Sequence, residues 1–135
     1  LQLRFLYTQE NRKYMKLIGN LIWFVFGGFV IALEYLVGSL LLMVTIIGIP
    51  FGLQTIKLAS LALWPFGRKP VLLDSAHGSL ATVMNIIWLL IGGLWIAITH
   101  AAFGLIFYIT IIGIPFGNQH LKLAGVALLP FGKRV

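Results

Sequence analysis

Cysteine is absent from the 135 residues, and only three acidic side chains are present. The lack of cysteine excludes disulfides, thiolate catalysis and cysteine-ligated metals. The sequence also contains no carboxylate pair, no Ser/His/Asp set and no phosphate-binding glycine loop. His77, His100 and His120 lack the spacing of metal ligands. We therefore expect no enzyme activity, no cofactor and no metal site.

Charge of either sign is scarce as well, with 10% charged residues against 60% hydrophobic ones. Soluble domains do not reach this balance. Residues 17–56 carry one charge, Glu34, and residues 82–121 carry none. Each run of 40 residues exceeds the ~20 that cross a bilayer as a helix. Because the runs lack the alternation of barrel strands, we predict an all-α membrane protein.

The net charge of +7 comes from basic residues at the ends of the apolar runs. This position is typical of topology signals and of contacts with anionic lipids, so we do not expect nucleic acid as a partner. Residues 1–14 are polar and basic, and Met15 followed by Lys16 resembles a natural start. We expect residues 1–14 to be a non-native or disordered leader.

The chain contains two copies of one unit, offset by 65 residues, with 25 identities in the 53 pairs from Leu17/Thr82 to Lys69/Arg134. The sequence therefore divides into repeat 1 (15–69), a polar cytoplasmic linker (70–81) and repeat 2 (82–135). The repeated positions include Asn20/Asn85, Trp23/Trp88, Gly27/Gly92, Gly28/Gly93, the segments 46–52 and 111–117, Lys57/Lys122 and the segments 65–67 and 130–132.

The basic pairs 68–69 and 133–134 end the two copies. They obey the positive-inside rule together only if each copy crosses the membrane an even number of times. We therefore predict two parallel repeats with both termini in the cytoplasm.

Two divisions fit each copy. The first is a transmembrane hairpin of residues 17–33 and 37–50 with a turn near Glu34, Tyr35 and Gly38, and the second is one long helix to about Ile47 followed by a crossing or re-entrant piece from Gly52. Residues 53–66 read as an amphipathic helix at the cytoplasmic interface, ended by the Pro-Phe-Gly segment. The predicted unit is thus a hairpin followed by an interfacial helix.

The doubled motifs Asn-x-x-Trp-x-x-x-Gly-Gly, Ile-Ile-Gly-Ile-Pro-Phe-Gly and Pro-Phe-Gly-Arg/Lys are specific enough to indicate a family. The chain resembles the YccF family, small bacterial inner-membrane proteins whose repeating unit is called the inner membrane component domain. The resemblance covers residues 15–134 and implies a bacterial cytoplasmic membrane. It supplies no catalytic or binding residues.

The repeated helix breaks are candidates for a transport pathway or gate, because breaks at corresponding positions of two copies mark binding sites in transporters. The alternative is a sharp elbow between helices, and in either case the threonines that precede the breaks can hydrogen-bond the freed carbonyls. The repeated lysines predict either contact with lipid phosphates or a basic vestibule. The candidate pathway residues are Thr45, Gly48, Pro50, Gly52, Lys57, Thr110, Gly113, Pro115, Gly117 and Lys122.

Small residues four apart predict close helix packing in lipid. The candidates are Gly27, Gly28, Ala32, Gly92, Gly93 and Ala97. Glu34 is not repeated, since Thr99 takes its place, and we expect it to be solvated at the outer turn of the hairpin.

Four short spans enclose little volume, so we expect a homo-oligomer that acts as a channel or permease-like component for a small ion or solute. The alternative is a non-transporting adaptor that binds a larger membrane protein or lipid.

Overall fold

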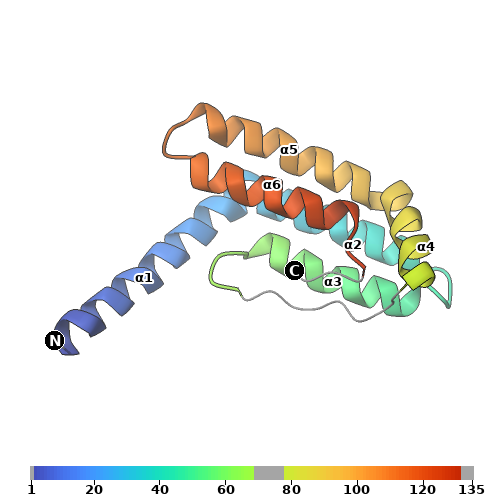
Figure 1. The fold of residues 1–135 in the computed structure, drawn as a ribbon, viewed down its shortest axis with the longest axis horizontal. Helices are drawn as coiled ribbons and strands as arrows, with labels where there is room; N and C mark the ends of the chain where they lie inside the picture. Colours follow the sequence, from blue (N-terminus) through green and yellow to red (C-terminus); the bar gives the residue numbers. More distant parts are fainter. Residues whose placement is uncertain (1, 69–77, 132–135) are drawn as a thin grey trace.

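The computed structural model describes residues 2–68 and 78–131, which form helices joined by short turns (Figure 1). Each copy contains one long helix with a π-helical segment in its middle, followed by one short helix. In repeat 1 these elements are α1 (Gln2–Trp23), η1 (Phe24–Gly28), α2 (Phe29–Met43) and α3 (Ile49–Leu63). Residues 2–14 form the first part of α1, so the expectation of a disordered leader is wrong for them. In repeat 2 they are α4 (Gly78–Trp88), η2 (Leu89–Gly93), α5 (Leu94–Ile109) and α6 (Ile114–Leu128).

The long helix of repeat 1 continues through Glu34, where the sequence also allowed a turn. The predicted turn near Glu34, Tyr35 and Gly38 is therefore wrong, and the long helix of the second division is confirmed. One charge does not end a helix whose backbone hydrogen bonds are all internal. Gly38 serves packing instead, because a Cβ there would lie 2.9 Å from the Trp88 ring.

The break between α2 and α3 is a compact elbow. The Oγ1 of Thr45 accepts a hydrogen bond from the Gly48 N–H at 3.1 Å and donates to the Leu42 carbonyl at 3.2 Å. The Oγ1 of Thr110 makes the same two bonds in repeat 2. The predicted role of the two threonines is confirmed, and the proline that follows sits in the first turn of α3 and of α6, where its missing N–H costs nothing.

Asn20 and Asn85 tie the long helix of each copy to the segment that ends it. The Asn20 side chain donates to the Phe66 carbonyl at 2.9 Å and accepts from the Phe66 N–H at 2.8 Å. Asn85 makes the same pair of bonds with Phe131 at 3.1 and 2.9 Å. These bonds satisfy backbone groups that the end of α3 or α6 leaves without helical partners.

The asparagine bonds form a clamp that holds the end of the short helix on the long helix. The repeated tryptophan and the second repeated glycine belong to this clamp. Trp23 Nε1 donates to the Ala62 carbonyl at 2.6 Å, and Trp88 Nε1 donates to the Ala127 carbonyl at 2.9 Å. A Cβ on Gly28 would lie 2.6 Å from the Trp23 ring. Asparagine, tryptophan and the second glycine are therefore repeated because together they dock the short helix onto the long one.

The two copies are related by an approximate two-fold axis, because their contacts are reciprocal. The Phe51 ring meets the Phe131 ring at 5.0 Å between centroids, and the equivalent rings of Phe116 and Phe66 meet at 5.4 Å. The axis passes between Glu34 and its equivalent Thr99, which are hydrogen-bonded to each other. The closing segment of each copy thus packs on the elbow of the other.

The central helices of the two copies lie antiparallel. Figure 1 shows that α2 and α5 run in opposite directions. The copies are interleaved, and the α2–α5 contact determines this direction, which is separate from the predicted orientation of the copies relative to the membrane. Because the two-fold axis relates the copies, equivalent residues of the two copies lie at the same height along that axis.

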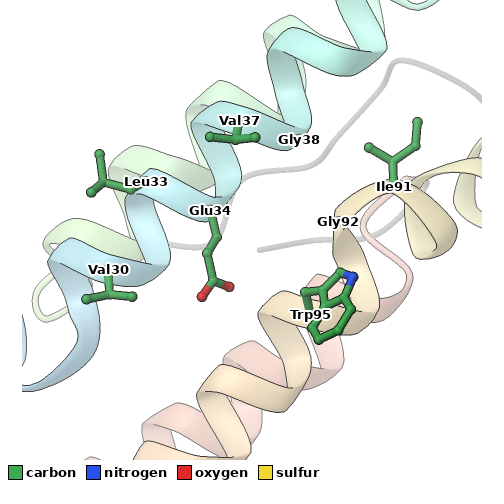
Figure 2. Close-up of a pocket in the computed structure, with 8 residues that line it drawn as sticks. All are labelled: Val30, Leu33, Glu34, Val37, Gly38, Ile91, Gly92 and Trp95. Carbon is green, nitrogen blue, oxygen red and sulfur yellow. The ribbon is translucent and has the colours of Figure 1, made fainter.

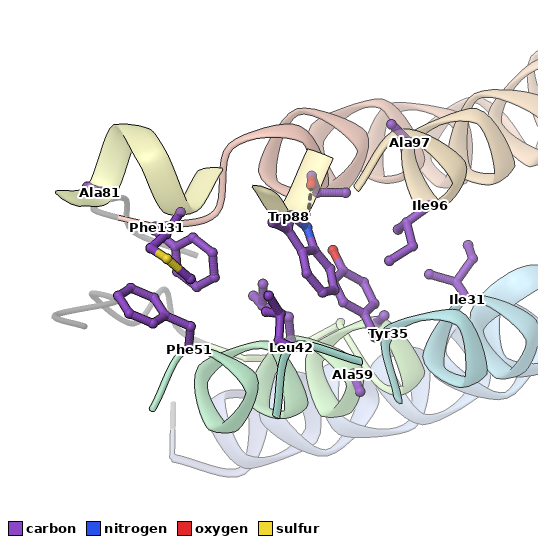
Figure 3. Packing of buried hydrophobic residues seen from close by; sticks show 14 residues of the cluster. Ile31, Tyr35, Leu42, Phe51, Ala59, Ala81, Trp88, Ile96, Ala97 and Phe131 are labelled. Carbon is purple, nitrogen blue, oxygen red and sulfur yellow. Dashed lines mark hydrogen bonds between the residues drawn. The ribbon is translucent and has the colours of Figure 1, made fainter. Parts of the chain in front are cut away.

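In each copy the short helix packs on the second half of the long one, which gives two helical hairpins, α2–α3 and α5–α6. The core lies between these two hairpins and is aromatic at its centre (Figure 3). Trp23 and Trp88 are completely buried, and the Trp88 ring stacks on Tyr35 at 5.9 Å between centroids. Other buried members are Ile31, Leu42, Phe51, Leu58, Ala59, Ala62, Ile96, Ala97, Ala127 and Phe131.

The outer surface separates into an apolar and a polar face. Two helices, Gln2–Met43 and Ser79–Ile109, are long and apolar enough to cross a membrane. Leu33 and Val37 of α2 are exposed, as are Leu105 and Ile106 of α5. By contrast, α3 and α6 expose several polar or small residues beside the apolar Leu53 and Leu121, and these are Lys57, Ser60, Asn118, Lys122 and Gly125.

We predict that Gly27→Ala destabilises the protein whereas Gly92→Ala, at the equivalent position, is nearly neutral. Gly27 has φ +131°, and a Cβ there would lie 3.0 Å from the Phe103 ring, while the nearest atom at Gly92 is 3.6 Å away. The strain at positive φ costs about 1–3 kcal/mol. Thermal unfolding in detergent measures the difference, and equal melting temperatures for the two variants would contradict the assigned kink.

Candidate functional site

Glu34 lies in the middle of α2 and lines an apolar groove between the two copies (Figure 2). The groove has a volume of about 350 Å³ and faces away from α3 and α6, which lie behind α2 and α5 in Figure 2. Its lining residues are Val30, Leu33, Glu34, Val37, Gly38, Ile91, Gly92 and Trp95. The expectation that Glu34 is solvated at a turn is wrong, because no turn exists there and the side chain is half-buried among apolar groups.

The hydrogen bonds of Glu34 suit a carboxyl group in either protonation state. Thr99 Oγ1 lies 2.7 Å from Glu34 Oε1 and 2.9 Å from the Trp95 carbonyl, but a hydroxyl has one proton. When the carboxyl is ionised, Thr99 donates to it. When it is protonated, Glu34 donates to Thr99 and Thr99 donates to Trp95. The Oε2 atom is buried and has no partner among the described residues.

A second polar group is buried on the other side of α5. His100 and His120 are fully buried, and their Nδ1 atoms lie 3.0 Å apart. Since a neutral imidazole carries one proton, one ring donates from Nδ1 and the other accepts. Both Nε2 atoms are buried without a hydrogen-bond partner among the described residues. The His120 ring also stacks on Trp23 of repeat 1 at 3.9 Å between centroids.

The buried histidines of repeat 2 take the place of hydroxyl-bearing residues of repeat 1, since His100 corresponds to Tyr35 and His120 to Thr55. Ser39 Oγ and Thr55 Oγ1 lie 2.5 Å apart and are also within hydrogen-bond distance of the Tyr35 and Gly52 carbonyls, respectively, so that two hydroxyl protons serve three contacts. The equivalents of Ser39 and Thr55 are Gly104 and His120. Gly104 leaves room for the larger ring, since a Cβ there would lie 3.3 Å from the His120 Cβ. The copies therefore differ at the buried polar positions next to the axis.

The predicted pathway residues are not gathered around one opening. The elbows 45–52 and 110–117 lie at opposite ends of the α2–α5 pair (Figure 1). Gly52 packs closely against α2, because a Cβ there would lie 2.8 Å from the Ser39 carbonyl oxygen. Gly117 packs against the Gly104 carbonyl in the same way. Pro50 and Pro115 are exposed at the helix starts, and Lys57 and Lys122 are exposed on α3 and α6.

The predicted packing residues all lie in helix contacts. Gly27, Gly28, Ala32, Gly92, Gly93 and Ala97 are buried. Gly92 approaches Gly38 across the axis, with a Cβ at Gly92 placed 3.7 Å from the Gly38 Cα. Gly28 and Gly93 pack inside their own copy against tryptophan and a backbone carbonyl. The small residues thus serve contacts within one chain.

Sequence reasoning missed the buried histidine pair and the Glu34–Thr99 contact. The histidines are 20 residues apart and lie on separate helices, so their spacing gives no signal. The Glu34–Thr99 contact joins equivalent positions of the repeat. An alignment of the two copies contained this signal, because residues near a two-fold axis meet their own equivalents.

These features define an all-helical membrane protein made of two interleaved copies of one unit. A family model described as an inner membrane component domain matches residues 18–68 and 83–133. The chain therefore belongs to the YccF family.

Curated relatives agree with this assignment. The chain is 34% identical over 129 residues to the inner membrane protein YccF of Escherichia coli (strain K12), with 90% of this chain and 87% of the relative covered. The inner membrane protein YccF of Shigella flexneri matches with the same identity and coverage. No solved structure matches the chain significantly.

We predict that dicyclohexylcarbodiimide, an apolar reagent for carboxyl groups, modifies Glu34 in membranes, because Glu34 lines a groove that admits an apolar molecule. Mass spectrometry locates the adduct, and Glu34→Gln serves as the control. A water-soluble carbodiimide should instead modify Glu10, which is exposed on α1. Faster modification of Glu34 by the water-soluble reagent would contradict the apolar surroundings.

Proposed function

We propose that the chain is a non-enzymatic membrane adaptor whose Glu34 groove binds a transmembrane helix of a larger membrane protein. The observation that carries the proposal is the half-buried Glu34 carboxyl group at the wall of an apolar groove, with one buried oxygen that has no hydrogen-bond partner among the described residues. Ionisable groups inside a membrane are costly and pair with another group. The occupant we expect therefore carries a lysine, an arginine or another hydrogen-bond donor at the depth of Glu34.

The shape of the groove supports a helix as the occupant. Gly38 and Gly92 form part of its lining, and small residues let helix backbones approach closely in lipid. The groove is open on the face away from α3 and α6, so a partner can reach it without separating the two copies.

The channel or permease-like function expected from the sequence is the second candidate. The buried core, with Trp88, Tyr35, Ile31 and Ile96 at its centre, fills the space between the two hairpins (Figure 3). A solute path would then run between subunits of a homo-oligomer. The observation that favours it is the symmetric pair of exposed cations, Lys57 and Lys122, which the axis places at one level.

Membrane placement follows from the exposed side chains. We propose that the two-fold axis lies along the membrane normal, with α3 and α6 at the cytoplasmic interface and α2 and α5 in hydrocarbon. Lys57 and Lys122 then reach lipid phosphates, and the apolar elbows stay in lipid, where Ile46 and Ile111 are each 86% exposed. The opposite choice, with α2 along the normal, would put both elbows in water and both lysines halfway across hydrocarbon.

This placement puts Arg68 and Phe131, the last described residues of the two copies, on the cytoplasmic side, as the charge pattern predicts. Each copy enters from the cytoplasmic side, turns at its elbow and returns. Anionic lipids are the expected partners of α3 and α6, and nucleic acid is not expected.

A photoreactive benzoylphenylalanine at Val37, in the groove, should crosslink in cells to a transmembrane peptide of another protein. Leu105, exposed to a similar degree outside the groove, is the control position. Glu34→Gln should reduce the adduct by ~10-fold, since a hydrogen bond to a charged group contributes ~1.5–3 kcal/mol. The double variant Glu34→Thr/Thr99→Glu moves the carboxyl to the equivalent position across the axis and should restore the adduct.

An adduct only with a second copy, combined with ion flux through proteoliposomes that Glu34→Gln abolishes, would replace the adaptor with the oligomeric channel. Equal adducts from Val37 in the parent and in Glu34→Gln would also reject the role of the carboxyl.

Single cysteines test the placement, because the chain has none of its own. Ser60 and Gly125 are equivalent positions on the exposed faces of α3 and α6. We expect Ser60→Cys and Gly125→Cys to react with an impermeant thiol reagent from the cytoplasmic side of oriented vesicles only. Labelling of the two positions from opposite sides would show that α2 and α5 lie along the normal.

A further inference from the structure

A second pocket lies outside the Glu34 groove, between α1 and the end of α3. Its volume is about 430 Å³. Lys13, Lys16 and Glu10 provide charged groups, Tyr14 and Trp64 provide aromatic rings, and the remaining lining residues are Leu17, Asn20, Phe66 and Gly67.

The pocket sits where α1 changes from polar to apolar. Residues 2–16 of α1 are all exposed, and the long apolar run begins at Leu17. A helix with this change crosses from water into lipid at that point, at the level of lipid headgroups. Tyrosine and tryptophan are enriched at that level because their rings are apolar and their edges are polar.

The residues of the pocket are held in place by the fold. Asn20 is 1% exposed and clamps the backbone of Phe66. Gly67 adopts φ +84°, and a Cβ there would lie 3.1 Å from the Lys16 side chain. The glycine therefore leaves space for the Lys16 stem to pass the end of α3 with its ammonium group free to bind.

Repeat 2 lacks this set of side chains although it keeps the clamp. The equivalents of Lys13, Lys16 and Trp64 are Gly78, Ala81 and Leu129. The fold therefore does not require the two lysines and the tryptophan, because repeat 2 forms the same clamp without them.

We propose that this pocket binds the phosphate-bearing headgroup of a membrane phospholipid. The ammonium groups of Lys13 and Lys16 contact the phosphate, and the ring of Trp64 packs beside the glycerol region. Glu10 offers a carboxylate to an ammonium group, so the charges of the pocket complement phosphatidylethanolamine, which carries both a phosphate and an amine.

The test uses the full chain in detergent, with phosphatidylethanolamine, phosphatidylglycerol and phosphatidylcholine added in turn and bound lipids counted by native mass spectrometry. The variant Lys16→Ala/Trp64→Leu gives repeat 1 the residues of repeat 2, so we expect it to fold. Arg4→Ala removes one positive charge from the exposed part of α1 outside the pocket and serves as the control.

We expect one tightly held phosphatidylethanolamine in the parent and in Arg4→Ala, and affinity at least about fivefold weaker in Lys16→Ala/Trp64→Leu, since one lysine near headgroups contributes ~1 kcal/mol. Lys16→Arg should retain the lipid. Equal retention in the double variant and the control would overturn the proposal. Displacement of the lipid by inorganic phosphate or glycerol phosphate at low concentration would identify a soluble anion as the ligand and also overturn it.

Discussion

The structure depends on two equivalent tryptophans, Trp23 and Trp88. Each is hydrogen-bonded to the short helix of its own copy, and its ring packs against a ring of the other copy. Trp88 donates from Nε1 to the Ala127 carbonyl near the end of α6, and its ring stacks on Tyr35 of repeat 1. Trp23 bonds the Ala62 carbonyl and stacks on His120 of repeat 2. In a hydrocarbon surrounding, an unpaired indole N–H or carbonyl is costly, so each bond fixes the short helix on the long one while the ring joins the copies.

Interleaving explains how so short a chain forms a defined core in lipid. Helices in a membrane gain little from burying apolar surface, and close packing and hydrogen bonds hold them together. The asparagine clamps, the threonine elbows and the tryptophan bonds are all hydrogen bonds to backbone groups that a helix end leaves free. The repeated motifs of the sequence are therefore mainly the parts that satisfy helix ends.

The two copies differ at a few buried polar positions. Duplication and symmetry account for the clamps, but Glu34 faces Thr99, and Thr55 of repeat 1, which lies beside Ser39, stands where repeat 2 has His120. The kink in η1 is also confined to repeat 1, where Gly27 adopts a positive φ beside His120. Because only one copy places a carboxyl group in the groove between the copies, we propose the Glu34 groove as the functional centre.

The sequence by itself determined the membrane class, the all-helical fold, the duplication, the elbows with their threonines and the family, because composition and repeated motifs are local properties of the chain. It did not determine the continuous path of α2 through Glu34, the antiparallel contact of α2 with α5 or the meeting of His100 and His120. Tertiary structure decided these features, because they depend on which surfaces of the two copies pack together. Hydropathy is nearly uniform along both runs, and a uniform pattern does not specify where one apolar helix ends or which face of it meets the next.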